Sequence, residues 1–247
     1  MQKCSIDKKP EVVVPGNKED TLNYCVDHFL KLGNEAIKDH GYFAVALSGG
    51  STPKEIFQRL SSRKHQLDWS LVRLFWGDER SVPPKDKESN YLMAFSSGLE
   101  NLGIPEKNIF RMKAESSIEE NAKAYEELIK KNTHKGRFDL VMLGMGDDGH
   151  TASLFPGSLG LHVTDRLVIA NFVPQKNTWR MTLTYSCINA ASNICFYIIG
   201  AGKASMLQAV LSYPLGSYPC QGVKNALWIC DRSAAEAFAL AQTPIFK

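Results

Sequence analysis

Apolar residues in this chain gather in short runs that alternate with segments in which they recur at helical spacing. Runs of strand-forming residues bounded by glycine, proline or polar turns are typical of buried strands. The runs of this kind span residues 12–14, 43–47, 72–76, 140–143, 166–172, 193–199 and 226–230. A further extended segment is expected just after Arg180.

Helical periodicity is clearest in two segments. In residues 21–40 apolar positions recur every three or four residues, and Gly41 is a suitable C-terminal stop. Residues 118–131 are predicted as an amphipathic helix. Its apolar face contains Ala122, Tyr125, Leu128 and Ile129. Shorter helices are expected at 89–97, at 204–211 and from Ser233 onward.

The alternation of strands and helices decides the predicted fold class. It predicts an α/β protein with a doubly wound, mostly parallel sheet and helices on both faces. We find no internal repeat, low-complexity segment or linker, so residues 1–247 are expected to form a single domain.

The stretch FDLVMLGMGDDGHTASLFP, residues 138–156, carries the strongest chemical signal. A buried strand ends in two glycines, then Asp147 and Asp148, then His150. Ligands of open α/β sheets bind beyond the carboxyl ends of the strands. His150 is therefore the candidate base, and a carboxylate two residues away can set its tautomer. The sequence leaves open whether Asp147 or Asp148 does so.

This stretch allows two other interpretations. The spacing Gly144-x-Gly146-x-x-Gly149 matches the dinucleotide-binding fingerprint, but that fingerprint requires a long helix directly after the loop. Here Pro156 and a following glycine end any helix within two turns. The other interpretation makes His150 a structural histidine that is merely hydrogen-bonded.

A second glycine turn lies at residues 48–53, SGGSTP. Thr52 is expected to cap a helix, with Pro53 at its first position and Glu55 closing a capping box. Backbone N–H groups at such a helix start favour an anion such as phosphate. Lys203 also lies at a predicted helix start, where a positive charge is unfavourable unless an anion lies beside it.

Composition narrows the class of ligand. Hydrophobic residues make up 44% and charged residues 22% of the chain, which is ordinary for a globular protein. A net charge of +3 with no basic run argues against nucleic acid and suits a small anionic molecule. No apolar stretch approaches membrane-spanning length. The six cysteines include no C-x-x-C pair, so reduced thiols and a cytoplasmic location are expected.

Several motifs together resemble a known family. They are LSGGSTP at 47–53, FWGDERSVP at 75–83, ESNY at 88–91, GMGDDGHTASLFP at 144–156, Arg180-x-Thr-x-Thr and the glycine turn at Lys203. In this order they resemble the 6-phosphogluconolactonases of the glucosamine-6-phosphate isomerase/6-phosphogluconolactonase family. The resemblance implies a Rossmann-like sheet and hydrolysis of 6-phospho-D-glucono-1,5-lactone in the oxidative pentose phosphate pathway. It implies no organic cofactor, and the proposed chemistry requires no metal.

The resemblance also implies roles for particular residues. His150 is the expected base, supported by Asp148, and Arg80 or backbone N–H groups near Gly146 would stabilise the oxyanion. The expected substrate- and phosphate-binding residues are Ser48, Gly49, Gly50, Ser51, Thr52, Asp78, Asn90, Arg180 and Lys203. The sugar-phosphate lactone is the expected partner, and binding of nucleic acid or a membrane is not expected. The protein is expected to be a monomer or a small homo-oligomer.

Two alternative functions remain at this stage. Glucosamine-6-phosphate deaminases resemble the same pattern, but they carry a glutamate where this chain has Phe155 and Asp-Glu-Tyr where it has Asp78-Glu79-Arg80. A non-catalytic sugar-phosphate sensor would keep Arg180 and Lys203 and would not need His150.

Overall fold

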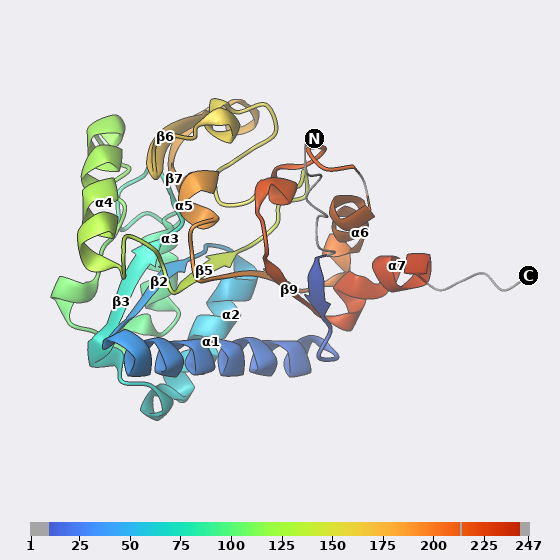
Figure 1. Ribbon diagram of the computed structural model, residues 1–247, viewed down its shortest axis with the longest axis horizontal. Coiled ribbons are helices and arrows are strands. Elements are labelled where there is room, and N and C mark those ends of the chain that lie inside the picture. The colour runs from blue at the N-terminus through green and yellow to red at the C-terminus, as the bar shows by residue number, and fades with distance from the viewer. Residues whose placement is uncertain (1–9, 213, 243–247) are drawn as a thin grey trace, which may run out of the picture.

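The computed structural model describes residues 10–212 and 214–242. Within them, a six-stranded parallel sheet has the order β1-β9-β8-β5-β2-β3 (Figure 1). Its strands are β1 (Glu11–Val13), β2 (Phe43–Leu47), β3 (Val72–Trp76), β5 (Leu140–Leu143), β8 (Asn193–Ile198) and β9 (Leu227–Cys230). The predicted parallel sheet is confirmed.

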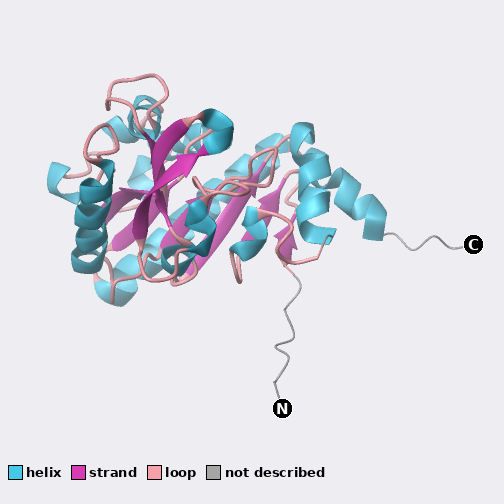
Figure 2. Cartoon of the chain, turned by 90° about the horizontal axis from the view of Figure 1, so that it is seen from above, coloured by secondary structure: helices cyan, strands magenta, loops and turns pink. Residues whose placement is uncertain are grey.

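Seven α-helices are found in the described residues, and helices surround the strands in the view of Figure 2. They are α1 (Lys18–His40), α2 (Ser51–Ser62), α3 (Asn90–Ser96), α4 (Ile118–Asn132), α5 (Tyr185–Ile188), α6 (Ala204–Ser212) and α7 (Arg232–Gln242). Short 3₁₀ helices are η1 (Lys64–Gln66), η2 (Trp69–Leu71), η3 (Leu99–Asn101), η4 (Glu106–Asn108), η5 (Leu159–His162), η6 (Pro174–Lys176), η7 (Ala201–Lys203) and η8 (Pro219–Gly222).

Helices cover both faces of the parallel sheet, as the two aromatic residues at the end of β3 show. Neighbouring side chains of a strand point to opposite faces. The ring of Phe75 packs against Tyr125 of α4, with centroids 5.9 Å apart. The ring of Trp76 stacks on Phe95 of α3, with centroids 6.3 Å apart. The predicted doubly wound arrangement is therefore confirmed.

A second, antiparallel sheet was not predicted. It contains β4 (Asp78–Arg80), β7 (Thr178–Leu183) and β6 (Val168–Val173) in the order β4-β7-β6. The charged triplet Asp78-Glu79-Arg80 that follows β3 pairs with β7 in this sheet. Arg180 was expected just before an extended run and instead lies inside β7.

The predicted capping box at the start of α2 is wrong. The helix begins at Ser51, its N-cap is Gly50 with φ +106°, and no side chain caps it. Only glycine adopts this backbone conformation easily, so the turn forces the helix to begin one residue before Thr52. Glu55 does not close a capping box; its carboxylate lies 2.8 Å from the ammonium of Lys18.

The two long predicted helices are confirmed, but the start of α1 and the burial of one residue in α4 differ from the prediction. α1 begins three residues earlier than expected, because Asn17 and Asp20 form a capping box there. Gly41 ends this helix in the left-handed conformation, as predicted. In α4, the expected apolar face is buried except for Leu128, whose exposure is 38%.

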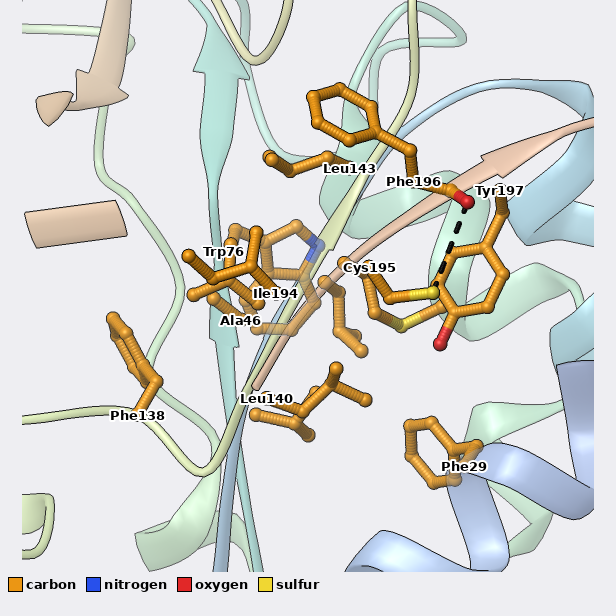
Figure 3. Packing of buried hydrophobic residues seen from close by; sticks show 14 of the residues in the cluster. Phe29, Ala46, Trp76, Phe138, Leu140, Leu143, Ile194, Cys195, Phe196 and Tyr197 are labelled. Carbon is orange, nitrogen blue, oxygen red and sulfur yellow. Dashed lines mark hydrogen bonds between the residues drawn. The ribbon is translucent and has the colours of Figure 1, made fainter. Parts of the chain in front are cut away.

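The buried core lies along the parallel strands and against the helices (Figure 3). The cysteines of the described residues, Cys25, Cys187, Cys195, Cys220 and Cys230, are buried and free of disulfides, as expected. Burial raises the pKa of each of these thiols. Cys4 lies outside the described residues. None of the described helices is apolar over a length that could cross a bilayer.

Candidate active site

The candidate residues follow neighbouring strands of the parallel sheet. Ser48 follows β2, Asp78 follows β3, His150 follows β5 and Lys203 follows β8. Parallel strands place their carboxyl ends at one edge of a sheet, so these segments meet there. The ends of β2 and β5 approach each other at this edge, since a Cβ atom added to Gly144 would lie 3.9 Å from the hydroxyl oxygen of Ser48.

His150 is hydrogen-bonded to Asp148, which settles the question left open by the sequence. The ring Nδ1 lies 2.5 Å from Oδ1 of Asp148, and the backbone N–H of His150 donates to the same oxygen over 3.1 Å. Burial acts to raise the pKa of Asp148, but these hydrogen bonds outweigh it and keep the pKa below its usual range. Asp148 is therefore ionised near neutral pH, and Nε2 of His150 is left for chemistry.

Asp147 points to a different partner. Its Oδ1 accepts a hydrogen bond from the ammonium of Lys203 over 2.6 Å. This bond lowers the pKa of Asp147. Lys203 lies at the end of η7, directly before α6. The carboxylate of Asp147 is thus the anion found beside the positive charge at this helix start.

Arg80 and Arg180 are brought together by the antiparallel sheet, where they are paired residues of β4 and β7. Arg80 donates from Nη1 to the carbonyl oxygen of Glu88 over 2.5 Å. The Nε atoms of both arginines are buried, and neither has a hydrogen-bond partner among the described residues. Burial and the charge of Arg80 lower the pKa of Arg180. Two such guanidinium groups form a site suited to an anion.

Asp78 and Asn90 lie beneath the surface of this site. Asp78 is 8% exposed and Asn90 is 2% exposed. The carboxylate of Asp78 accepts hydrogen bonds from Ser153 over 2.6 Å and from Asn90 over 3.2 Å. A Cβ atom added to Gly49 would lie 2.0 Å from Oδ1 of Asn90, so only glycine fits there. These contacts join the loops after β2, β3 and β5 to one another.

The turn at residues 48–52 lies at the start of α2. The hydroxyl of Ser48 donates to the carbonyl oxygen of Gly49 over 3.2 Å. Ser51 and Thr52 belong to the first turn of the helix. The first N–H groups of a helix have no partner within it, and the helix dipole favours negative charge there. Ser51 and Thr52 therefore offer N–H groups to an anion at this edge of the sheet.

Glu79 was not among the predicted site residues, although it is central to the architecture. It is 3% exposed, and its carboxylate accepts hydrogen bonds from the hydroxyl of Ser89 and the backbone N–H groups of Arg80, Asn90 and Tyr91. Burial raises its pKa, against the effect of these bonds. The sequence feature that could have identified Glu79 is its central position in the triplet Asp78-Glu79-Arg80. Neighbouring side chains of a strand point to opposite faces, so Glu79 lies on the face of β4 opposite to Asp78 and Arg80.

Comparison with known proteins places this arrangement in context. A sequence model of the family described as glucosamine-6-phosphate isomerases/6-phosphogluconolactonase matches residues 16–229. The 6-phosphogluconolactonase of Chlamydia muridarum (strain MoPn / Nigg) is 38% identical over 247 residues, which cover 97% of this chain and 95% of that protein. The solved 6-phosphogluconolactonase from Trypanosoma cruzi has a TM-score of 0.81 at 28% identity, covering 94% of this chain and 97% of that one.

The fold is also shared with the alternative enzyme class. A solved monomeric glucosamine-6-phosphate deaminase has a TM-score of 0.79, covering 92% of this chain and 99% of that one, at 17% identity. At this identity the similarity concerns the fold alone, because one fold can carry several chemistries. The choice between the two activities therefore depends on the side chains around His150.

Proposed function

Because the chain belongs to the glucosamine-6-phosphate isomerase/6-phosphogluconolactonase family, we propose that it hydrolyses 6-phospho-D-glucono-1,5-lactone to 6-phospho-D-gluconate. The observation that carries the proposal is the hydrogen bond between Nδ1 of His150 and Asp148, which leaves Nε2 as the free acceptor. A neutral imidazole in this tautomer is a suitable general base for water.

In the proposed mechanism, Nε2 of His150 takes a proton from water as the water oxygen attacks C1 of the lactone. The carbonyl electron pair moves onto oxygen and gives a tetrahedral oxyanion, which needs a hydrogen-bond donor already in place. The guanidinium of Arg80 and the backbone N–H groups near Gly146 are the two candidates. The C1–O bond of the ring then breaks, and His150 returns the proton to the departing oxygen.

The phosphate of the substrate is proposed to bind away from the reacting carbon. Arg180 offers a buried guanidinium whose Nε has no hydrogen-bond partner among the described residues. The start of α2 at residues 48–52 and Lys203 complete the binding groups. Binding energy from a remote phosphate can orient the ester for attack. Asp78 and Asn90 are proposed to hold these loops in position from below.

The side chain stacked on His150 favours the lactonase over the deaminase. Phe155 occupies the position of the deaminase glutamate, and its ring lies against the imidazole. An aromatic ring cannot accept the hydrogen bond that a carboxylate would accept from the histidine. A sensor is disfavoured because binding alone gives no reason for the His150–Asp148 pair.

We propose that residues 1–247 act as one domain in the cytoplasm, within the oxidative pentose phosphate pathway, as a monomer or small homo-oligomer. No organic cofactor enters the mechanism. Among the described residues, no group of three or more His, Cys, Asp or Glu side chains is arranged to hold a metal ion.

One assay tests the proposal. Freshly prepared 6-phosphogluconolactone is incubated with the protein, and 6-phosphogluconate is measured against a no-enzyme blank that records spontaneous hydrolysis. Glucosamine 6-phosphate is run in parallel, with ammonia as the product measured. We expect catalysed lactone hydrolysis and no ammonia above background. Ammonia release at a comparable kcat would replace the lactonase assignment with the deaminase.

A further inference from the structure

We propose that Phe155 is a positioning residue that holds the imidazole of His150 in the orientation required for catalysis. The proposal rests on the proposed function of His150 as the base. The two rings are stacked, with centroids 3.8 Å apart and an angle of 18° between their planes. Phe155 is 5% exposed, whereas the side chain of His150 is 27% exposed. One face of the imidazole is therefore covered by an almost completely buried ring.

The other restraints on the imidazole act at its Nδ1 edge. Asp148 accepts the hydrogen bond from Nδ1, and Gly146 approaches the ring so closely that an added Cβ would lie 2.0 Å from Nδ1 and 2.1 Å from Cε1. A side chain at residue 146 would therefore displace the ring. Gly146, Asp148 and Phe155 restrain the Nδ1 edge and one face of the imidazole, and they place no such restraint on the ring edge that carries Nε2.

The hydrogen bond to Asp148 cannot by itself give a rigid ring. The torsion that rotates an imidazole about its Cβ–Cγ bond has a broad energy profile. The side chain of Asp148 is 41% exposed, so water competes for its oxygen atoms. Stacking of two rings involves no exchangeable donor or acceptor, and water at the site does not weaken it in the same way. Phe155 thus supplies the restraint that the partly exposed carboxylate lacks.

The backbone around Phe155 is fixed independently of its side chain. The N–H of Leu154 donates to the carbonyl oxygen of Thr151 over 2.9 Å, and the N–H of Ser158 donates to that of Phe155 over 3.0 Å. The side chain of Gln175 in η6 donates to the carbonyl oxygen of Pro156 over 2.6 Å. Replacing the ring with an aliphatic side chain should therefore leave the loop in place, and this makes the idea testable.

The test compares Phe155→Leu with Phe138→Leu, which removes a fully buried phenylalanine that precedes β5. Both variants lose a buried aromatic ring, so both should lose thermal stability. We expect only Phe155→Leu to lower kcat, on the order of ten- to a hundredfold, because small misplacement of a catalytic group has effects of this size. KM for the lactone should stay within about twofold of wild type, since phosphate binding is remote.

A double-mutant cycle tests whether Phe155→Leu lowers kcat through the imidazole of His150. If Phe155 acts through the imidazole, Phe155→Leu should cause no further loss of kcat in a His150→Asn background. Equal losses in both backgrounds would overturn the proposal, as would equal losses in Phe155→Leu and Phe138→Leu. An unchanged kcat in folded Phe155→Leu would also overturn it. Phe155→Met serves as a second aliphatic variant if the leucine variant fails to fold.

A proton NMR measurement tests the stacking without reference to activity. The current of the phenyl ring should shift the ring-proton resonances of His150 upfield, and these resonances are assigned by their loss in His150→Asn. The upfield shift should disappear in Phe155→Leu and persist in Phe138→Leu. Absence of the shift in the wild-type protein would contradict the positioning role. If the shift is present but the lactone is not hydrolysed, the proposed function fails and the stacking does not.

Discussion

Arg80 and Arg180 are opposite each other in the pairing of β4 with β7, and the Nε of each is buried without a partner among the described residues. Two like charges on opposed strand positions destabilise a sheet. Burial and this neighbouring charge lower the pKa of Arg180. A phosphate bound by the guanidinium of Arg180 would offset the repulsion. The pair therefore has the features expected of an anion-binding site, in which repulsion between positive charges lowers the stability of the folded protein.

Arg180→Ala should raise KM for the phosphorylated lactone at least about tenfold, from loss of a charge-assisted contact of roughly 1.5–3 kcal/mol. Thermal stability should not fall, because the repulsion from Arg80 is removed. Unphosphorylated gluconolactone should be a poor substrate of the wild type. Arg63→Ala is the matched control, since it removes a surface guanidinium that pairs with Asp27. Equal efficiency of the wild type on the two lactones would refute the phosphate site.

His150→Asn should lower kcat by about 10²–10⁴-fold, because general base catalysis contributes a factor of this order. KM should change little. The lowered pKa of Asp148 keeps the carboxylate that supports the imidazole ionised near neutral pH. kcat and Tm are measured on one preparation; a destabilised but fully active variant would remove His150 from the mechanism.

Asp148→Asn should lower kcat less than His150→Asn, because it removes the support of the base and leaves the base itself. Asp147→Asn is its matched control in the same turn. The structure pairs Asp147 with Lys203, so this second variant should leave kcat within about twofold of wild type. It should also lower KM about two- to fivefold by freeing Lys203, the range expected for loss of an exposed ion pair. A large fall in kcat for Asp147→Asn would show that the two aspartates share one role.

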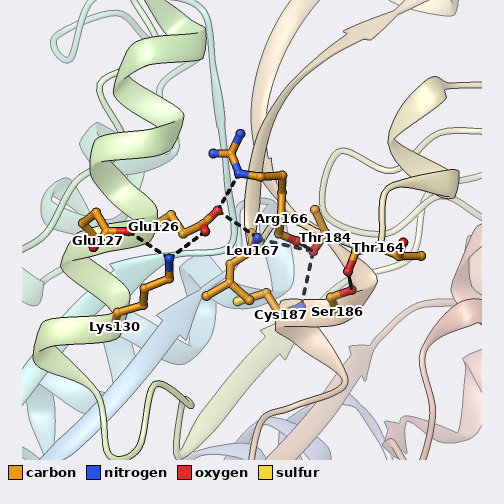
Figure 4. Close-up of polar contacts among 9 residues, drawn as sticks. All are labelled: Glu126, Glu127, Lys130, Thr164, Arg166, Leu167, Thr184, Ser186 and Cys187. Carbon is orange, nitrogen blue, oxygen red and sulfur yellow. Dashed lines mark hydrogen bonds and ion pairs between the residues drawn. The ribbon is translucent and has the colours of Figure 1, made fainter.

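Glu126 of α4 should make stability depend on pH through its contacts with Lys130 of the same helix and with the segment just before β6 (Figure 4). Burial raises its pKa, but hydrogen bonds from Lys130, the N–H of Leu167 and Arg166 outweigh it and bring the pKa to about 2. The folded-state value lies below the usual value of 4.5, so this stabilisation is full above that pH and is lost as pH falls toward 2.

Glu126→Gln should therefore lower the free energy of unfolding near pH 7 by roughly 1.5–3 kcal/mol. The difference from wild type should shrink as the pH is lowered from 5 toward 2. Glu127→Gln is the control, because Glu127 also contacts Lys130 but its side chain is 73% exposed. Chemical denaturation at several pH values provides the measurement. A difference independent of pH would show that packing, and not charge, explains the effect.

Local sequence patterns were sufficient for much of the fold and for the identity of the candidate base. The strands β2 and β5 are continuous apolar runs, β3 is interrupted by Arg73 alone, and a strand buried on both faces has few alternatives. Helix α1 combines one apolar face with a glycine stop, both of which are set within the segment. His150 could be chosen because it lies in the loop that follows the end of β5, and in a parallel sheet that loop lies at the ligand-binding edge.

Tertiary structure decided which groups meet across distances in the sequence. β4 is three residues long and charged, and it becomes a strand because β7, about a hundred residues later, supplies its hydrogen-bond partners. Asp147 and Asp148 are equivalent neighbours in the sequence, and only the direction of the turn gives Lys203 to one and His150 to the other. Phe155 is an apolar residue in a loop until folding places its ring on the imidazole. Local propensity acts over a few residues, whereas these contacts depend on backbone paths that the whole chain determines together.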